Sequence, residues 1–301
     1  MFEGKLPTLA VNRGERFQAS VKYLVVGYPV VFLGLFFCSS LVLVFVFSFY
    51  SNISGGYYEP AFTFENYVRF FTNELYFNRF VYTIKLAMLV TVATVLVSYP
   101  LGYHIGRAQS ELYRRVMLLT IMSSLWITYI IRAYAWTVIL SRNGVVNQVL
   151  VALGVFESAQ SLSPSYWGLV VGLVYIMVPF MVLTIYNSVT KIDDQLILAS
   201  KNLGAGPLQT FRKVTLPLSA NGVFSGSLLV FILTVGTYIL PKVLGKPNDW
   251  PIAVIIGDQI TQQSNVPFGA AISVVVAVTV LLILFVAMQV SNVDSIGDAN
   301  V

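Results

Sequence analysis

The chain has 301 residues, of which 57% are hydrophobic and only 10% are charged, whereas a soluble globular domain has about 25% charged residues. A soluble fold of this size cannot bury so much apolar surface, so the composition excludes an ordinary cytosolic enzyme, a disordered chain and a collagen-like or coiled-coil rod. The net charge of +5 indicates orientation in a membrane rather than nucleic-acid binding, because the charges avoid the long apolar runs.

Charged residues separate apolar segments that are long enough to cross a bilayer, which takes about 20 residues in a helix. Asp, Glu, Lys and Arg are absent from 23–58, 86–106, 158–190, 214–241 and 259–293. A sixth segment is interrupted only by Arg132. The sequence therefore predicts an all-α membrane protein with a transmembrane domain over 23–290. The expected six transmembrane helices are 23–50, 81–104, 116–140, 165–190, 220–244 and 268–290.

Basic residues predict the orientation of these helices. Six spans place both termini on one side, and most of the basic residues outside the spans fall there: Lys5, Arg13, Arg16, Lys22, Arg107, Arg114, Arg115, Lys191, Lys201, Arg212 and Lys213. The other side has Arg69, Arg79, Arg142 and Lys246. The positive-inside rule then predicts that the terminal segments 1–22 and 291–301 are cytoplasmic. The uncharged stretch 143–156 is too short to span and is expected to form an interfacial or re-entrant helix.

The cytoplasmic loop 191–219 is predicted to hold two short helices at the membrane surface. Four apolar residues recur at helical spacing and form one face: Ile192, Leu196, Ala199 and Leu203. Gly204 follows them as a helix stop, and Pro207 suits the first turn of a second helix that runs to about Lys213. Such a face can dock on a partner protein or rest on lipid headgroups, and amphipathicity alone does not choose between them.

The same loop resembles the coupling loop of bacterial ABC importer permeases. Residues 198–219, LASKNLGAGPLQTFRKVTLPLS, repeat the Gly, Phe and Leu-Pro of that signature at the same offsets. Leu198-Ala199-Ser200 replaces the family's Glu-Ala-Ala, so the acidic residue of the signature is absent. Other segments are similar to the spermidine/putrescine-type branch of the family: 98–108, 130–136, 143–150, 236–245 and 266–273.

The resemblance implies a fold and a set of partners. The expected fold is the type I ABC importer permease, in which six helices pair with a second, similar permease subunit in the bacterial inner membrane. Two cytoplasmic ATPase subunits would bind ATP and Mg²⁺, and a periplasmic solute-binding protein would deliver the solute. The residues expected to couple to the ATPase are Leu196, Ala199, Leu203, Gly204 and Ala205.

The residue inventory favours a subunit without catalysis of its own. No G-x-x-x-x-G-K-[ST] motif occurs, so a partner would have to bind the ATP phosphates. One cysteine and one histidine offer no metal site, and no paired carboxylates or nucleophile–base set are available. We therefore expect a non-enzymatic membrane protein with no cofactor and no nucleic-acid partner.

Polar and aromatic residues inside the predicted spans are candidates for the solute path. An arginine inside a span costs about 2.5–3.5 kcal/mol on insertion scales, so Arg132 either faces the path or extends to the outer interface. Helix breaks near Pro179 and Pro241 can line a cavity, although a simple kink is the alternative. The other candidates, whose rings can equally be buried fillers, are Trp126, Tyr129, Tyr175, Thr237 and Tyr238.

Lys242 and Asp258 are candidates for an external gate. Lys242 lies near the outer end of the fifth span, where extension to the interface is the alternative. Asp258 is expected in a short external helix within 250–266 that touches the binding protein or caps the cavity, and a solvated loop acid is the alternative. The spermidine/putrescine-type branch often carries glutamates where Thr237 and Lys242 stand here. The solute class is therefore open between a polyamine and a zwitterionic or anionic compound, such as an amino-acid derivative, an opine or a phosphonate.

The main alternative function is that of a stand-alone secondary carrier or channel. A carrier needs acidic residues for a coupling ion, and a channel needs a filter, but the predicted spans contain no Asp or Glu. The Gly168/Gly172 and Gly222/Gly226 pairs predict close helix crossings, which suit either class.

Overall fold

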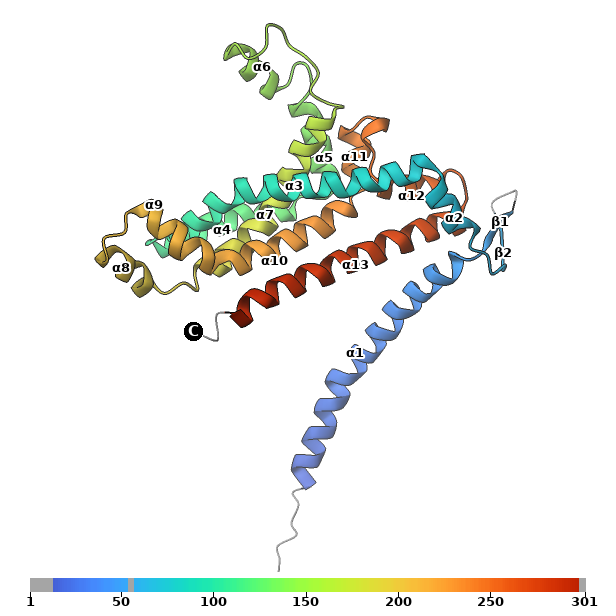
Figure 1. The fold of residues 1–301 in the computed structure, drawn as a ribbon, viewed down its shortest axis with the longest axis horizontal. Coiled ribbons are helices and arrows are strands. Elements are labelled where there is room, and N and C mark those ends of the chain that lie inside the picture. The colour runs from blue at the N-terminus through green and yellow to red at the C-terminus, as the bar shows by residue number, and fades with distance from the viewer. Residues whose placement is uncertain (1–12, 54–56, 298–301) are drawn as a thin grey trace, which may run out of the picture.

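The computed structural model describes residues 13–53 and 57–297, and most of them are helical (Figure 1). Five helices are long and apolar enough to cross a membrane, and one bent pair forms a sixth candidate. Residues 1–12 and 298–301, which belong to the predicted terminal segments, lie outside the described residues.

The described residues form a series of helices and one small two-stranded sheet. The first half contains α1 (Arg13–Phe47), β1 (Ser51–Ile53), β2 (Tyr57–Glu59), α2 (Glu65–Thr72), α3 (Glu74–Gly106), α4 (Glu111–Trp126), α5 (Tyr129–Ile139) and α6 (Val145–Ala152). The second half contains α7 (Tyr166–Val189), α8 (Asp194–Asn202), α9 (Pro207–Thr210), α10 (Leu216–Val235), α11 (Ile239–Leu244), α12 (Ile252–Thr261) and α13 (Val266–Gly297). A π-helical turn, Phe211–Thr215, joins α9 to α10, and a 3-10 turn, Pro247–Asp249, precedes α12. The two strands pair antiparallel as a small hairpin.

Helices α3, α7 and α10 form the centre of the bundle, and α7 is the most buried of the candidate spans. Glycines let these helices approach closely. A Cβ on Gly102 of α3 would lie 2.8 Å from Ile185 of α7, and one on Gly222 of α10 would lie 2.7 Å from the Thr184 carbonyl oxygen. The close crossing predicted from the Gly222/Gly226 pair is therefore confirmed, because both glycines face α7.

The third predicted span, 116–140, is not one straight helix. It divides into α4 and α5, whose axes differ by 97°, and Figure 1 shows α5 turning away from the direction of α3 and α7. Ile127 and Thr128 at the junction have extended backbones, and both are β-branched residues with low helix propensity. The expected continuous helix was therefore wrong, and the sequence has no proline or glycine at this junction that would predict the break.

The fifth predicted span, 220–244, also differs from a single helix. The spanning helix α10 ends at Val235, and Gly236, Thr237 and Tyr238 separate it from the short α11. Pro241 lies in the first turn of α11, where a missing N–H costs little. Pro179, in contrast, lies inside the unbroken α7 and causes no break.

The second loop helix is not separate from the fifth span. From Pro207 the chain stays helical through the π-helical turn to Val235, over 29 residues. The wider turn directly precedes Pro217, which has no N–H and whose ring would clash with the carbonyl four residues earlier in a regular helix.

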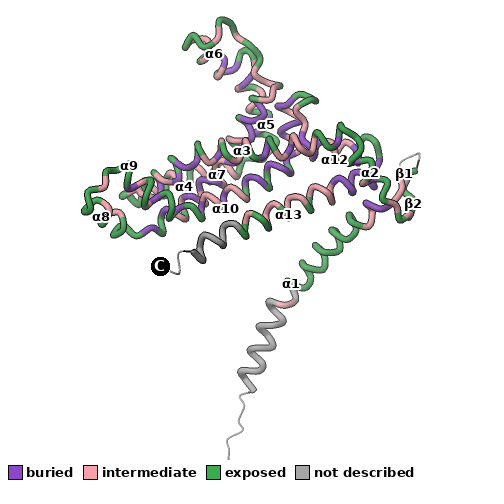
Figure 2. Tube along the Cα trace, in the orientation of Figure 1, coloured by how far each residue is buried: buried purple, intermediate pink, exposed green. Residues whose placement is uncertain are grey.

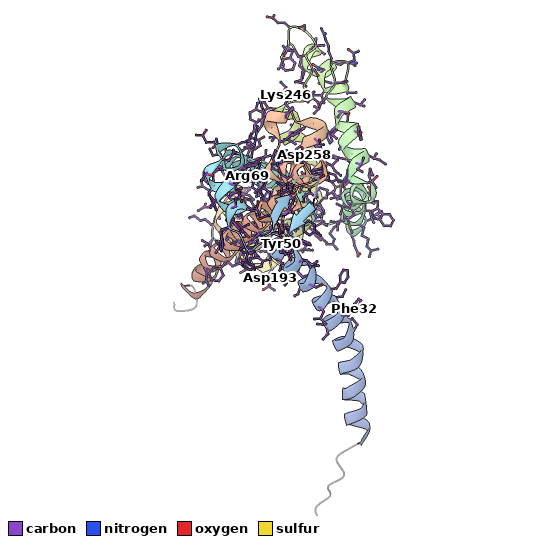
Figure 3. The ribbon with its side chains drawn as sticks, turned by 90° about the vertical axis from the view of Figure 1, so that its right-hand side faces the viewer. Phe32, Tyr50, Arg69, Asp193, Lys246 and Asp258 are labelled. Atoms are coloured by element: carbon purple, nitrogen blue, oxygen red, sulfur yellow. The ribbon has the colours of Figure 1, made fainter. Side chains whose placement is uncertain are left out.

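Helix α1 leaves the bundle, and its apolar surface is exposed (Figures 1 and 2). None of its 19-residue apolar segment, Pro29–Phe47, is buried in the chain. Figure 3 shows Phe32 on the part of α1 that projects away from the other helices. Lipid or a partner subunit must cover the exposed apolar segment of α1.

The hairpin, α2 and α12 lie at the opposite end of the bundle from α8.

Candidate functional site

Two helix breaks meet at a cavity of about 370 Å³. One wall comes from the start of α5, a second from the middle of α7, and a third from the segment between α10 and α11. Residues next to both breaks therefore line the same cavity. The lining residues are Tyr129, Arg132, Ile176, Met177, Phe180, Leu233, Gly236, Thr237, Tyr238 and Ile239.

Four of the predicted solute-path residues line this cavity: Tyr129, Arg132, Thr237 and Tyr238. The Tyr129 hydroxyl and the Thr237 Oγ1 lie 2.8 Å apart and share a hydrogen bond, which joins the two helix breaks. The Arg132 guanidinium carbon lies 5.9 Å from the centre of the Tyr129 ring. The structure therefore brings together residues that are more than 100 positions apart in the sequence.

Two predicted path residues lie elsewhere. Trp126, at the end of α4, is 90% exposed and does not line the cavity. Tyr175 packs edge-on against Trp136, with ring centres 5.2 Å apart. Sequence reasoning missed the apolar lining from α7, such as Met177 and Phe180, because apolar residues in a spanning helix carry no signal that distinguishes a cavity wall from a lipid contact.

Lys242 and Asp258 form an ion pair with Nζ and Oδ1 2.6 Å apart. Lys242 lies on α11, beyond the end of the spanning helix α10, and Asp258 lies on α12. The Lys242 ammonium also donates to the Tyr238 hydroxyl at 3.0 Å and lies 5.7 Å from the Trp250 ring centre. The bonds to Asp258 and Tyr238 raise the pKa of Lys242. Figure 3 shows Asp258 below Lys246 in the upper part of that view.

Replacing Lys242 with Met is expected to lower the apparent melting temperature of the purified protein. The change leaves the Asp258 carboxylate, whose side chain is 20% exposed, without its ammonium partner, and losing a charged hydrogen bond of this kind costs about 2 kcal/mol. The matched control is Arg115→Met, which breaks the Glu111–Arg115 pair on the surface of α4, with both side chains more than 60% exposed. That pair contributes about 0.5 kcal/mol at most. If Lys242→Met and Arg115→Met had equal melting temperatures in detergent, the ion pair between Lys242 and Asp258 would not stabilise the contact of α11 with α12.

The segment predicted to couple to an ATPase lies at the other end of the bundle. Asp193 is the N-cap of α8, and its side chain accepts a hydrogen bond from the Gln195 N–H. Gly204 follows the C-cap residue Leu203 and has a φ of +83°. Gly204 donates to the Lys201 carbonyl at 2.9 Å and Ala205 donates to the Ser200 carbonyl at 3.1 Å. These two bonds form a Schellman motif, so the predicted helix stop at Gly204 is confirmed.

The apolar residues of this segment face outward. Leu196 is 49% exposed and Leu203 is 88% exposed, and Ala199 and Gly204 are exposed as well. Ala205 is partly covered, and together with Leu203 and Gly204 it borders a hollow between α8 and the start of the long helix. Ile192, which was expected on the same face, is buried and precedes the first turn of α8. The four exposed residues and the partly covered Ala205 form what we call the coupling face: Leu196, Ala199, Leu203, Gly204 and Ala205.

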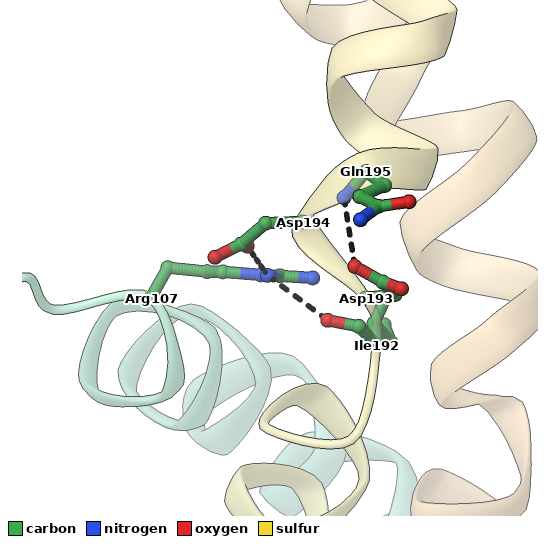
Figure 4. Close-up of polar contacts among 5 residues, drawn as sticks. All are labelled: Arg107, Ile192, Asp193, Asp194 and Gln195. Atoms are coloured by element: carbon green, nitrogen blue, oxygen red, sulfur yellow. Dashed lines mark hydrogen bonds and ion pairs between the residues drawn. The ribbon is translucent and has the colours of Figure 1, made fainter.

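Arg107 holds the start of α8 against the end of α3 (Figure 4). Its Nη1 donates to the Asp194 carboxylate at 2.6 Å and to the Ile192 carbonyl at 3.4 Å. Asp194 lies in the first turn of α8, where the helix dipole favours a negative charge. Sequence reasoning placed Arg107 only among the orientation charges, because its partner lies 87 positions later in the chain.

Comparisons with known proteins agree with this geometry. The family described as binding-protein-dependent transport system inner membrane components matches residues 94–294. The spermidine/putrescine transport system permease protein PotB of Escherichia coli strain K12 is 30% identical over 268 residues, which cover 89% of this chain and 95% of that protein. PotB of Salmonella typhimurium strain LT2 is 28% identical over 278 residues, covering 92% and 95%.

Solved structures support the same fold. A chain of a bacterial alginate ABC transporter, in complex with its alginate pentasaccharide-bound periplasmic protein, superposes with a TM-score of 0.73 at 17% identity and covers 95% of this chain and 97% of that one. A chain of the MetNI methionine ABC transporter superposes with a TM-score of 0.52 at 21% identity. The family match extends over more than half of the chain, and it includes the cavity and the coupling face. The chain is therefore a member of the family of binding-protein-dependent transport system inner membrane components, the permease subunits of ABC importers.

Proposed function

We propose that this permease forms one half of a solute path across the bacterial inner membrane, with the coupling face and both termini in the cytoplasm. A second permease subunit supplies the other half of the path. Two ATPase subunits bind ATP and Mg²⁺ and dock on the coupling face, and a periplasmic binding protein delivers a small polar solute to the opposite end. The solved relatives support this arrangement, since one was determined with its periplasmic protein bound.

The coupling face is the observation that carries this proposal. Its leucines are exposed at the end of a loop, although burial of such side chains is strongly favoured in water. The sequence contains no phosphate-binding loop of its own. An ATPase that covers the coupling face would act on α8 and on the continuous helix Pro207–Val235, whose far end borders the cavity with Leu233.

The relatives do not define the solute charge. The PotB proteins carry the names of the polyamines spermidine and putrescine, whereas the alginate transporter imports an acidic polysaccharide. Permeases of this fold therefore serve both cationic and anionic solutes. The charge of the solute of this chain has to be inferred from the charged residues that line its own cavity.

Purification of the tagged chain from its native membranes tests the proposal. We expect an ATPase and a second permease subunit to co-purify with it, and uptake by the reconstituted complex to require both ATP and the binding protein. Leu203→Asp should release the ATPase, because it places a charge in an apolar contact, whereas the exposed Leu282 of α13, changed to Ala as a control, should not. Solute movement by the chain alone, without nucleotide, would instead identify a secondary carrier or a channel.

A further inference from the structure

Arg132 is a buried cation without an anionic partner among the described residues. The residue is only 8% exposed, and its Nε and Nη1 atoms are buried and make no hydrogen bond. The ion pairs of the described residues involve Arg107, Arg115 and Lys242 as cations. Guanidinium groups stay charged at any physiological pH, so this one needs an anion to offset its desolvation.

The surroundings of Arg132 form a site and not merely a gap in the packing. Arg132 lines the 370 Å³ cavity, whose lining contains no Asp or Glu. It lies in the first turn of α5, where the positive end of the helix dipole adds to its charge. This turn starts at the 97° break with α4, and the N-terminal ends of broken helices are where transporters bind anionic groups of their solutes.

Hydroxyl groups complete the polar lining of the cavity. The Tyr129 and Thr237 hydroxyls bond to each other at 2.8 Å, and each can also donate to, or accept from, a bound solute. The remaining walls are apolar, from Ile176, Met177 and Phe180. Such a lining fits a solute with one anionic end and an apolar or uncharged body, because small-molecule sites usually combine apolar walls with a few oriented polar groups.

We propose that this cavity is an anion-binding subsite on the solute path, in which Arg132 binds a carboxylate or a similar oxyanion of the transported solute. The proposal rests on the assignment of the chain as an importer permease. It makes the solute an acid or a zwitterion, because a polyamine has only cationic groups and would be repelled by Arg132. Bidentate binding of a planar carboxylate is the arrangement that guanidinium groups favour.

Charged thiol reagents can test this proposal even though the solute is unidentified. In the complete importer, Cys38→Ser removes the single cysteine of this chain, and Leu233→Cys places a reporter thiol on the cavity wall. Two methanethiosulfonates are compared, the anionic sulfonatoethyl and the cationic trimethylammonium-ethyl reagent. The rate of modification by each is measured from the increase in mass of this chain. Their ratio is divided by the ratio measured for free 2-mercaptoethanol.

We expect the anionic reagent to be favoured, and Arg132→Gln to lower the normalised ratio about tenfold, as removal of one nearby charge in a partly dry cavity should. Arg132→Lys keeps the charge and should preserve most of the preference. The matched control is Arg142→Gln, which removes the same charge from an exposed residue outside the cavity and should leave the ratio unchanged.

Other results would overturn the anion subsite. A cation-favouring ratio, or a ratio that Arg132→Gln does not change, would show that a carboxylate of the second permease already neutralises Arg132. Co-purification of the ATPase and ATP hydrolysis are measured on the same samples. An assembled, ATP-hydrolysing complex without anion preference contradicts the subsite alone, whereas a chain without an ATPase contradicts the importer assignment.

Discussion

Gly204→Trp is expected to abolish ATP-driven uptake while the chain still inserts and folds. A Cβ at Gly204 would meet no atom within 4 Å, and Gly204 is exposed on the coupling face, so a side chain can start at this position without a clash at its first atom. A φ of +83° adds about 1–2 kcal/mol of strain for any residue with a Cβ. If the coupling face enters an ATPase groove, the loss of a central contact should reduce uptake at least about 30-fold.

Two matched alanine variants separate strain from docking. Gly204 and Gly206 both have open space at the Cβ position, but Gly206 has a φ of −70°, so only Gly204→Ala should lower the melting temperature. The uptake rate in reconstituted vesicles and the amount of co-purified ATPase are measured for all variants. Uptake at the normal rate by Gly204→Trp would show that the coupling face does not contact the ATPase at Gly204.

Gly222→Val is expected to prevent accumulation of folded protein in the membrane. A Cβ on Gly222 would overlap the Ser188 side chain and lie 2.7 Å from the Thr184 carbonyl oxygen. Both belong to α7, so α7 and α10 would have to separate at the centre of the bundle. Overpacking in a core typically costs about 1–3 kcal/mol, and here the obstacle includes backbone, which cannot rotate away.

The control for this substitution is Gly34→Val, in the exposed apolar part of α1, where a Cβ meets nothing within 4 Å. Membrane-inserted protein is quantified by its elution as a single species from a sizing column in mild detergent. Normal elution of Gly222→Val, with unchanged stability, would contradict the close crossing of α7 and α10 as a requirement for the fold.

The sequence predicted the spanning helices better than the connections between them. The predicted span 165–190 agrees with α7 within one residue at each end. It lies inside the charge-free gap 158–190, because placing a charge in lipid is costly over the whole span. The break after α4 escaped prediction because a local dip in helix propensity, at Ile127-Thr128, is too weak a signal. The break between α10 and α11 lies close to Pro241, where the sequence left a break and a simple kink as alternatives. Neighbouring helices that satisfy the backbone decide whether the chain bends there.

The candidate residues show a similar division. Arg132 stood out from the sequence because its charge is anomalous inside a span, and Gly204 stood out because a glycine after a helical pattern predicts a stop. The contact of Arg107 with α8 had no such signal, because exposed basic residues near membrane surfaces are common. Long-range pairings of this kind depend on how the helices pack and cannot be read from spacing.

The unbroken helix from Pro207 to Val235 has a mechanical consequence. Its 29 residues extend over about 43 Å, so a tilt of about 10° about the Pro207 end would displace the Val235 end by about 7 Å. Binding at one end of this helix that favours one tilt also moves the other end. The coupling free energy between binding at the two ends is the same in both directions. If an ATPase docks on the coupling face as we propose, a molecule that binds against Leu233 and favours one tilt changes the affinity for the ATPase by the same factor as the ATPase changes the affinity for that molecule.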